Sequence, residues 1–332
     1  MKGLPESTGR PFFIPHVLIM ILNRTSETTY HRRKLTAIGH RIGSTPIHTM
    51  TSLSPKPGVE IMAKLEWEQF GGSVKARAAY RIIRYALTTG RLRPGLRLLD
   101  ASSGNTGIAY ASICAAMDIP LTLCLPENAS RERILILKAL GVELILTSRL
   151  EGTDGAQRVA AALANDQPER FYYADQYNNP RNWQAHFYTT AKEIVEQTSG
   201  RVTHFVAGLG TTGSFTGTAR GLKCHDPSIQ MTSLQPEWPM HGLEGWKHLE
   251  TAKVPGIYDP SLADRQVEID TGEAYDLLRF VARREGLLIS PSAAANLLGA
   301  KKIADSLSTG TIVTLLADNG EKYSEVLSQI ID

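Results

Sequence analysis

The fold is decided by a stretch that reads Thr203-His204-Phe205-Val206-Ala207-Gly208-Leu209-Gly210-Thr211-Thr212-Gly213-Ser214. An apolar strand leads directly into a G-x-G-x-x-G loop that opens a helix. Glycines let a backbone approach a ligand closely, and the free N–H groups at a helix start favour anions. The loop predicts a phosphate cradle. A dinucleotide site, in which Glu237 would bind a ribose, and a plain tight turn are the alternatives.

The same alternation of apolar strands and helical patterns continues through the chain from about residue 35. It predicts an α/β protein with mostly parallel sheets. The expected strands are Glu60–Leu65, Arg97–Ala101, Leu121–Leu125, Glu143–Leu146, Thr203–Gly208, Ile229–Leu234 and Thr311–Leu316. Several of them end in loops of Gly, Ser, Thr or Asn, which is where open α/β sheets bind ligands.

Composition narrows the class of protein. The chain has 332 residues, of which 42% are hydrophobic and 21% charged, which suits two α/β lobes. A net charge of +3 is too small to indicate a nucleic acid or a membrane surface as partner, so we expect a small molecule. The three cysteines have no C-x-x-C spacing and the histidines no metal-ligand spacing, which predicts no metal and a reducing, cytoplasmic location.

Residues 1–34 are basic, rich in Ser and Thr, and show little periodicity, so we expect a peripheral or mobile N-terminal arm. A transit peptide, or a later start at Met20, would have the same composition. The apolar run from Val17 to Leu22 is far too short to span a membrane. No small-residue cleavage site follows it, which argues against a secretory signal.

A second loop reads Gln69-Phe70-Gly71-Gly72-Ser73-Val74-Lys75-Ala76-Arg77 and runs into an amphipathic helix. Ser73 is the expected N-cap, which places Lys75 in the first helical turn. A cation there opposes the helix dipole, so the position favours a lysine with a lowered pKa that acts as an imine-forming nucleophile. A solvated lysine beside a cap is the alternative.

Two further loops precede helices. The segment Asp100-Ala101-Ser102-Ser103-Gly104-Asn105-Thr106-Gly107 offers hydroxyls and backbone N–H groups to a carboxylate or phosphate, unless it only caps its own helix. The segment Ser290-Pro291-Ser292 also starts a helix, with Ser292 as the expected N-cap. No Gly-x-Ser-x-Gly elbow is present to indicate a hydrolase.

Taken in order, these segments resemble the cysteine synthases, which are pyridoxal-phosphate enzymes of fold type II. The resemblance covers almost everything after residue 35 and rests on Gly43–Ile47, Gly71–Arg77, Ser103–Gly107, Leu125–Arg133, Gly152–Ala156, Gln176–Pro180, Gly208–Ser214 and Asp318–Tyr323. Within the family, Thr211-Thr212-Gly213 and Leu234–Glu237 are similar to the cysteine synthase B branch, which includes enzymes that accept O-phosphoserine.

The resemblance implies a tryptophan synthase β-like fold with two three-layer α/β/α lobes and mostly parallel sheets. Residues 50–187 would form a smaller, mobile lobe that carries the substrate-carboxylate loop. Residues 35–49 and 188–332 would form a larger lobe with the phosphate loop. It also implies a homodimer.

The resemblance further implies a role for each candidate residue. Lys75 would hold pyridoxal phosphate and act as the catalytic base. The remaining cofactor ligands would be Asn105 at the ring hydroxyl, Ser292 at the ring nitrogen, and Gly210, Thr211, Thr212, Gly213 and Ser214 at the phosphate. The substrate would contact Ser102, Ser103, Thr106 and Gln176 through its carboxylate, and Lys247 near its leaving group.

The implied reaction is β-replacement on O-acetylserine or O-phosphoserine by sulfide or a thiol, through an aminoacrylate intermediate, to give L-cysteine. Departures from the family pattern include Gln69-Phe70 for Asn-Pro, Ala76 for Asp, Ser102 for Thr, and Ser290–Ala294 for a glycine-containing segment. They leave open a synthase of another β-substituted alanine, a cystathionine β-synthase-like enzyme, or a non-catalytic regulator. A nicotinamide-dependent oxidoreductase rests on Gly208–Gly213 alone.

Overall fold

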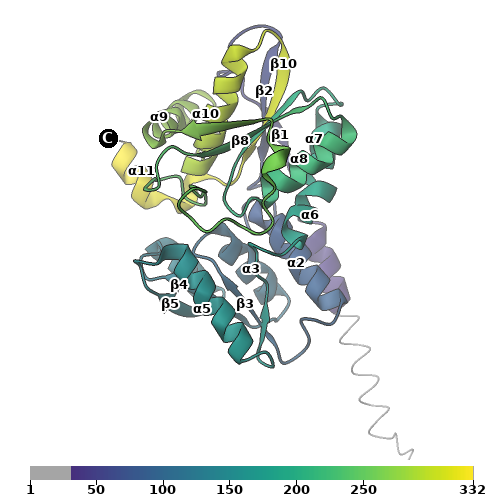
Figure 1. The fold of residues 1–332 in the computed structure, drawn as a ribbon, viewed down its shortest axis with the longest axis vertical. Helices are drawn as coiled ribbons and strands as arrows, with labels where there is room; N and C mark the ends of the chain where they lie inside the picture. The colour runs from purple at the N-terminus through teal and green to yellow at the C-terminus, as the bar shows by residue number, and fades with distance from the viewer. Residues whose placement is uncertain (1–30, 332) are drawn as a thin grey trace, which may run out of the picture.

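The computed structural model describes residues 31–331, which form two lobes stacked one above the other (Figure 1). Residues 1–30, most of the predicted N-terminal arm, lie outside the described residues. Residues 31–39 are helical, and Leu35 and Ile38 are buried in the core of the smaller lobe. Among the described helices, none combines the length and the apolar character that a membrane crossing requires.

The larger lobe is built on a six-stranded sheet. Its strands follow the order β1 (Ile47–Thr49), β2 (Val59–Leu65), β10 (Gly310–Leu316), β7 (His204–Gly208), β8 (Gln230–Pro236) and β9 (Arg265–Ile269). Only the β1–β2 pair is antiparallel. One face is covered by α9 (Thr271–Arg284) and α10 (Pro291–Ser306), and the other by α7 (Thr190–Gln197) and α8 (Gly213–His225).

Side chains alternate between the two faces of this sheet, as they must on any strand. Ile312 of β10 packs into the cluster beneath α9 and α10. Its neighbour Val313 packs into the cluster on the opposite face, with Phe205 of β7 and Phe215 of α8. The inner strands β2, β10, β7 and β8 are therefore mostly buried on both sides, which is why they read as nearly continuous apolar runs.

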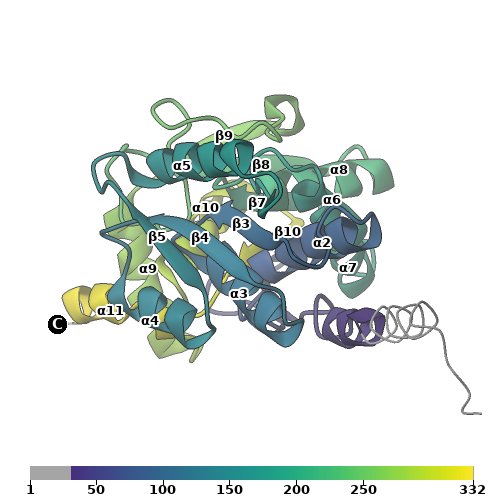
Figure 2. The ribbon, with the colours of Figure 1, turned by 90° about the horizontal axis from the view of Figure 1, so that it is seen from below.

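The smaller lobe repeats this arrangement with four parallel strands. Their order is β5 (Glu143–Thr147), β4 (Leu121–Pro126), β3 (Arg97–Ala101) and β6 (Phe171–Tyr173). Figure 2 shows α5 (Gly152–Asp166) on one side of the sheet and α3 (Asn105–Ala116) and α4 (Arg131–Ala139) on the other. In the same lobe, α2 (Lys75–Thr88) packs beside α3. The two lobes therefore have the predicted α/β/α layers.

The predicted lobe boundaries are wrong in two places. Strand β2 was assigned to the smaller lobe, yet all seven of its residues pair with β10 in the six-stranded sheet. The segment 35–49 was assigned to the larger lobe, yet its first residues pack in the smaller lobe's core. An apolar strand pattern shows that a strand is buried but not which sheet it joins, because the partners come from distant parts of the chain.

The two lobes are joined by α6 (Arg181–Tyr188), which packs against both α2 and α8. The chain ends with α11 (Ser324–Ile330) at the edge of the larger lobe (Figure 1). Single-turn 3-10 helices occupy Pro260–Leu262 and Gly320–Lys322. The starts of α2, α3, α8 and α10 meet where the lobes face each other, and this is where the predicted site residues gather.

Candidate active site

A polar pocket lies between the lobes and brings together six of the predicted cofactor residues. Its lining includes Lys75, Asn105, Gly210, Thr211, Ser214 and Ser292. They come from the starts of α2, α3, α8 and α10 and from the loop between β7 and α8. Four helices therefore begin at this one pocket, and helix N-termini favour an anionic ligand.

Lys75 is the first residue of α2, and its amine faces this pocket. Burial lowers the pKa of Lys75, while the carboxylates of Asp318 and Glu66 oppose that shift. The lowered pKa increases the fraction of Lys75 whose amine is neutral, and the neutral amine is the form that attacks as a nucleophile. The N-cap position belongs to Val74 and has no side-chain cap, so the prediction that Ser73 caps α2 is wrong. The Ser73 hydroxyl is instead buried without a hydrogen-bond partner among the described residues.

The glycine-rich loop is shaped by close contacts. A Cβ on Gly210 would lie 1.9 Å from the carbonyl oxygen of Gly245, a backbone atom that cannot move aside. Thr212 has a φ of +67° and is the N-cap of α8, whose first residue is Gly213. The Thr212 hydroxyl is buried and has no hydrogen-bond partner in the described part of the chain. Such a loop fits a phosphate, with its charge at a helix N-terminus.

Asn105 and Ser292 are free to bind a ring. Asn105 Nδ2 donates to Asp318 at 2.9 Å, and within residues 31–331 Asn105 Oδ1 has no hydrogen-bond partner. The expectation that Ser292 caps α10 is wrong, because the cap is Ser290, whose Oγ accepts from the Ala293 N–H at 3.2 Å. The Ser292 hydroxyl, 3.2 Å from that of Ser290, is thereby left for the pocket.

These observations fit pyridoxal phosphate. One pocket is lined by Lys75, whose pKa is lowered, and by the phosphate loop. It is also lined by Asn105, whose amide oxygen has no partner within the described residues, and by Ser292, which offers a neutral hydroxyl. The dinucleotide alternative gains no support from this pocket, because Glu237, which it needs for a ribose, is not among the lining residues.

The predicted substrate-carboxylate residues lie at the end of β3 and beside it. Ser102 Oγ accepts from the Gly107 N–H at 2.9 Å, so this hydroxyl also fixes the loop. Gln176 is buried, and its Nε2 donates to the Ala101 carbonyl oxygen at 2.8 Å. Thr106 is buried in the first turn of α3, next to the half-buried Ser103. We call Ser102, Ser103, Thr106 and Gln176 together the donor subsite.

Lys247 is not among the residues that line the pocket. Its ammonium group pairs with Asp154 of α5 at 2.7 Å and lies 5.3 Å from the centre of the Tyr177 ring. The pair joins the two lobes. The role of Lys247 near a leaving group stays a prediction, and Asp154 already offsets the charge of Lys247.

Two carboxylates at the site were not assigned a role from the sequence. Asp318 is fully buried and accepts from Asn105 and, at 2.8 Å, from the Tyr323 hydroxyl. Glu244 lines the pocket and pairs with Arg133 of α4. Asp318 lies in one of the segments that resembled the family, but nothing in its local sequence shows that it would face Lys75 and Asn105.

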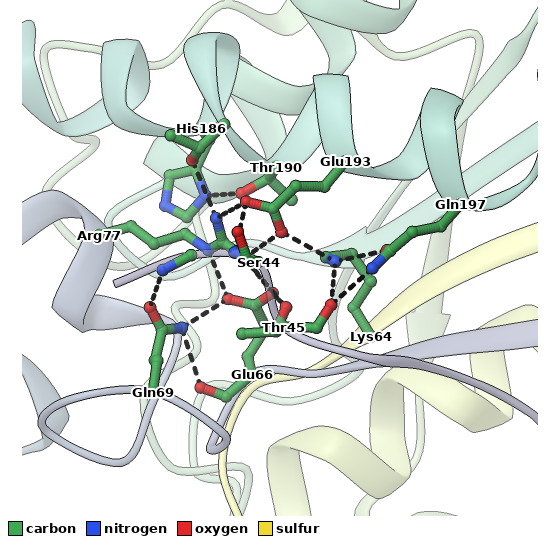
Figure 3. Close-up of polar contacts among 12 residues, drawn as sticks. Ser44, Thr45, Lys64, Glu66, Gln69, Arg77, His186, Thr190, Glu193 and Gln197 are labelled. Atoms are coloured by element: carbon green, nitrogen blue, oxygen red, sulfur yellow. Dashed lines mark hydrogen bonds and ion pairs between the residues drawn. The ribbon is translucent and has the colours of Figure 1, made fainter. Parts of the chain in front are cut away.

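A buried network of charges holds the start of α2 (Figure 3). The Arg77 guanidinium donates to Glu66 at 2.7 Å and 2.8 Å and to Glu193 of α7 at 2.6 Å and 2.8 Å. Lys64 of β2 pairs with Glu193 at 3.0 Å and donates to the Thr45 carbonyl oxygen. The network ties α2, two residues beyond Lys75, to the larger lobe. Sequence reasoning missed it because its members come from four distant segments.

Comparison with known proteins supports the same kind of site. Residues 38–318 match the family described as "Pyridoxal-phosphate dependent enzyme". The chain is 44% identical to a cysteine synthase of Aquifex aeolicus over 92% of its own length and 95% of the relative's. It is 38% identical to cysteine synthase B of Salmonella typhimurium, covering 85% and 92% of the two chains. A crystal structure of cysteine synthase from Entamoeba histolytica superposes with a TM-score of 0.84 at 33% identity, covering 89% and 91%.

The fold and the site therefore define a pyridoxal-phosphate-dependent enzyme of fold type II. Within that class the chain belongs to the cysteine synthases. This membership confirms the family, the fold class, the cofactor and the enzymatic nature expected from the sequence.

Proposed function

We propose that this enzyme forms L-cysteine by replacing the acetate of O-acetyl-L-serine with sulfide. In this reaction the α proton leaves, the β carbon–oxygen bond breaks to release acetate, and hydrosulfide adds to the β carbon as the α proton returns. When bound, pyridoxal phosphate supplies the electron-withdrawing ring that makes the α proton removable. The observation that carries the proposal is Lys75 at a helix start, in one pocket with the phosphate loop.

Lys75 would hold the cofactor and then take the α proton at Nζ. Its lowered pKa favours the neutral amine that both tasks require. Ser292 would hydrogen-bond the ring nitrogen as a neutral hydroxyl. Such a partner does not keep the ring nitrogen protonated, which favours elimination of a leaving group over long-lived carbanion chemistry.

The donor subsite would bind the α-carboxylate. The start of α3 offers backbone N–H groups and the Thr106 hydroxyl, and Gln176 lies beside it across the end of β3. We propose that closure of the smaller lobe over this carboxylate excludes water from the reaction. Asp154–Lys247 and Arg133–Glu244, two of the ion pairs that cross between the lobes, support such a closed arrangement.

Charge at the pocket supports an acetyl rather than a phosphate leaving group. Glu244 contributes a carboxylate to the lining, and Lys247 is paired with Asp154. Glu244 is itself paired with Arg133, so its carboxylate does not repel a phosphate dianion strongly, but neither Arg133 nor Lys247 is left unpaired to attract one. The B-branch resemblance pointed the other way, so both donors need to be compared.

The test measures cysteine formation from sulfide with each donor at equal concentration. We expect the kcat/KM for O-acetylserine to exceed that for O-phosphoserine, and Lys75→Ala to abolish turnover with both. A preference for O-phosphoserine that is lost in Lys247→Ala would reverse the donor assignment. Turnover by Lys75→Ala equal to that of the wild type would overturn the proposed mechanism.

We also propose a cytoplasmic homodimer. All three cysteines are free thiols, with Cys224 exposed, which supports a reducing compartment. A surface hollow lined by Trp183, Phe187 and Tyr188, together with Arg220 and Lys223, supports an association surface. Light scattering on the purified enzyme should give twice the mass of one chain, and a monomeric mass would contradict the dimer.

A further inference from the structure

A buried path of hydrogen bonds joins the donor subsite to the glycine-rich loop, and Asn182 is its centre. Asn182 is the second residue of α6, and only 2% of its surface is exposed. Its Nδ2 donates to the carbonyl oxygen of Gln176 at 2.8 Å and to Thr211 Oγ1 at 3.1 Å. One amide nitrogen thus uses both of its protons to span two loops that are 35 residues apart in sequence.

At one end of the path, Gln176 is fixed to the end of β3. Its side chain donates to the Ala101 carbonyl oxygen at 2.8 Å, and its backbone N–H donates to Asp100 at 3.3 Å. Ala101 immediately precedes Ser102, where the donor loop begins. A shift of Gln176 would therefore move the edge of the donor subsite.

At the other end, Asn182 packs tightly against the phosphate loop. Thr211, which accepts its second hydrogen bond, lines the pocket. A Cβ on Gly213 would lie 2.0 Å from Asn182 Oδ1, and the three nearest heavy atoms all belong to the Asn182 side chain. A side chain at position 213 would therefore collide with Asn182, which explains the glycine there.

We propose that Asn182 is a positioning residue that holds the donor subsite and the phosphate loop at a fixed separation. It lies outside the pocket lining and acts through Gln176 and Thr211. Loss of its amide leaves the Gln176 carbonyl and the Thr211 hydroxyl without this donor in a buried setting. The donor and the cofactor would then both be held less firmly. The inference rests on the proposed function, because it assigns Gln176 to the donor and Thr211 to the cofactor.

The test compares Asn182→Ala with Asn182→Leu, which keeps the volume and the branching but cannot donate. In both holoenzymes we expect the KM for O-acetylserine and the rate of cofactor release to rise about tenfold, with kcat little changed. Asn178→Ala is the matched control, since Asn178 is an exposed asparagine of the same loop, and its side chain bonds only Asp175 and Gly256 within residues 31–331. Its KM and release rate should stay at the wild-type values.

A double-mutant cycle separates this role from general destabilisation. Thr211→Val removes the acceptor at the phosphate loop, so Asn182→Ala should accelerate cofactor release less in that background than in the wild type. If the Asn182 variants do not fold, Thr211→Val alone should still raise the donor KM. Fully additive effects, or Asn182 variants with wild-type KM and release rate, would overturn the inference. A wild-type enzyme without cofactor or turnover would instead refute the proposed function.

Discussion

Arg77→Met removes the cation at the centre of the buried network beneath Lys75. Methionine fills much of the same volume, but it leaves Glu66 and Glu193 without their main partner. Glu66 is fully buried, and the side chain of Glu193 is only 12% exposed. Removing one member of a buried ion pair costs about 3–5 kcal/mol, because the remaining charge is neither solvated nor compensated.

The pKa of Glu193 gives an independent measure of how strongly Arg77 stabilises this carboxylate. Burial alone would raise it, but the hydrogen bonds and charge of Arg77, with help from Lys64, lower it from 4.5 to about 2. A shift of that size corresponds to about 3 kcal/mol in favour of the ionised carboxylate in the folded state. Because the folded-state pKa is depressed, this contribution is complete above pH 4.5 and is lost as the pH falls toward 2.

Thermal unfolding of the holoenzyme at pH 7 provides the assay. A chain of this length loses roughly 4–7 °C in Tm for 3–5 kcal/mol. The double variant Arg77→Met with Glu66→Gln removes the stranded charge of Glu66, so it should lose less stability than the two single variants together. Two results would refute this account of the network. One is a Tm of Arg77→Met within about 1 °C of the wild-type Tm, far less than the expected loss of roughly 4 °C or more. The other is a stability loss in the double variant equal to the sum of the losses in the two single variants.

Four further substitutions test the site. Gly210→Ala forces a Cβ against the Gly245 carbonyl oxygen, so the purified protein should lose its bound cofactor, as seen by visible absorption. Burial raises the pKa of Asp100 to about 7, so the stability of Asp100→Asn relative to the wild type should rise between pH 4 and 7 in urea titrations. Ser290→Ala should cost about 1 kcal/mol as a lost N-cap, whereas Ser292→Ala should change the cofactor's absorption spectrum with little loss of stability.

The seven strands expected from the sequence are all present. Six of them are runs of mostly buried residues, whereas in the edge strand β5 both Glu143 and Leu146 are exposed. Strands β1, β6 and β9 were missed: they have three to five residues and include exposed or half-buried positions. Their strand character comes from the neighbour with which they pair, which no local pattern contains.

The loops that end strands and start helices were predictable as ligand sites because glycine, hydroxyl and helix-start signals are local. Lys75, Asn105 and Ser292 do meet in one pocket. The caps at Ser73 and Ser292 were each placed wrongly, since several neighbouring residues can satisfy the same pattern. Asp318 and Asn182 owe their positions to contacts over more than 25 residues, which only the folded chain reveals.

The central claim is that Lys75 and pyridoxal phosphate together replace the β substituent of an activated serine. The most direct measurement titrates the purified holoenzyme with O-acetylserine, follows the visible absorption of the cofactor, and then adds sulfide and quantifies cysteine. We expect the spectrum to change on donor addition and to return as cysteine forms, with neither change in Lys75→Ala. A wild-type spectrum that does not respond to the donor, or no cysteine after sulfide is added, would contradict the claim.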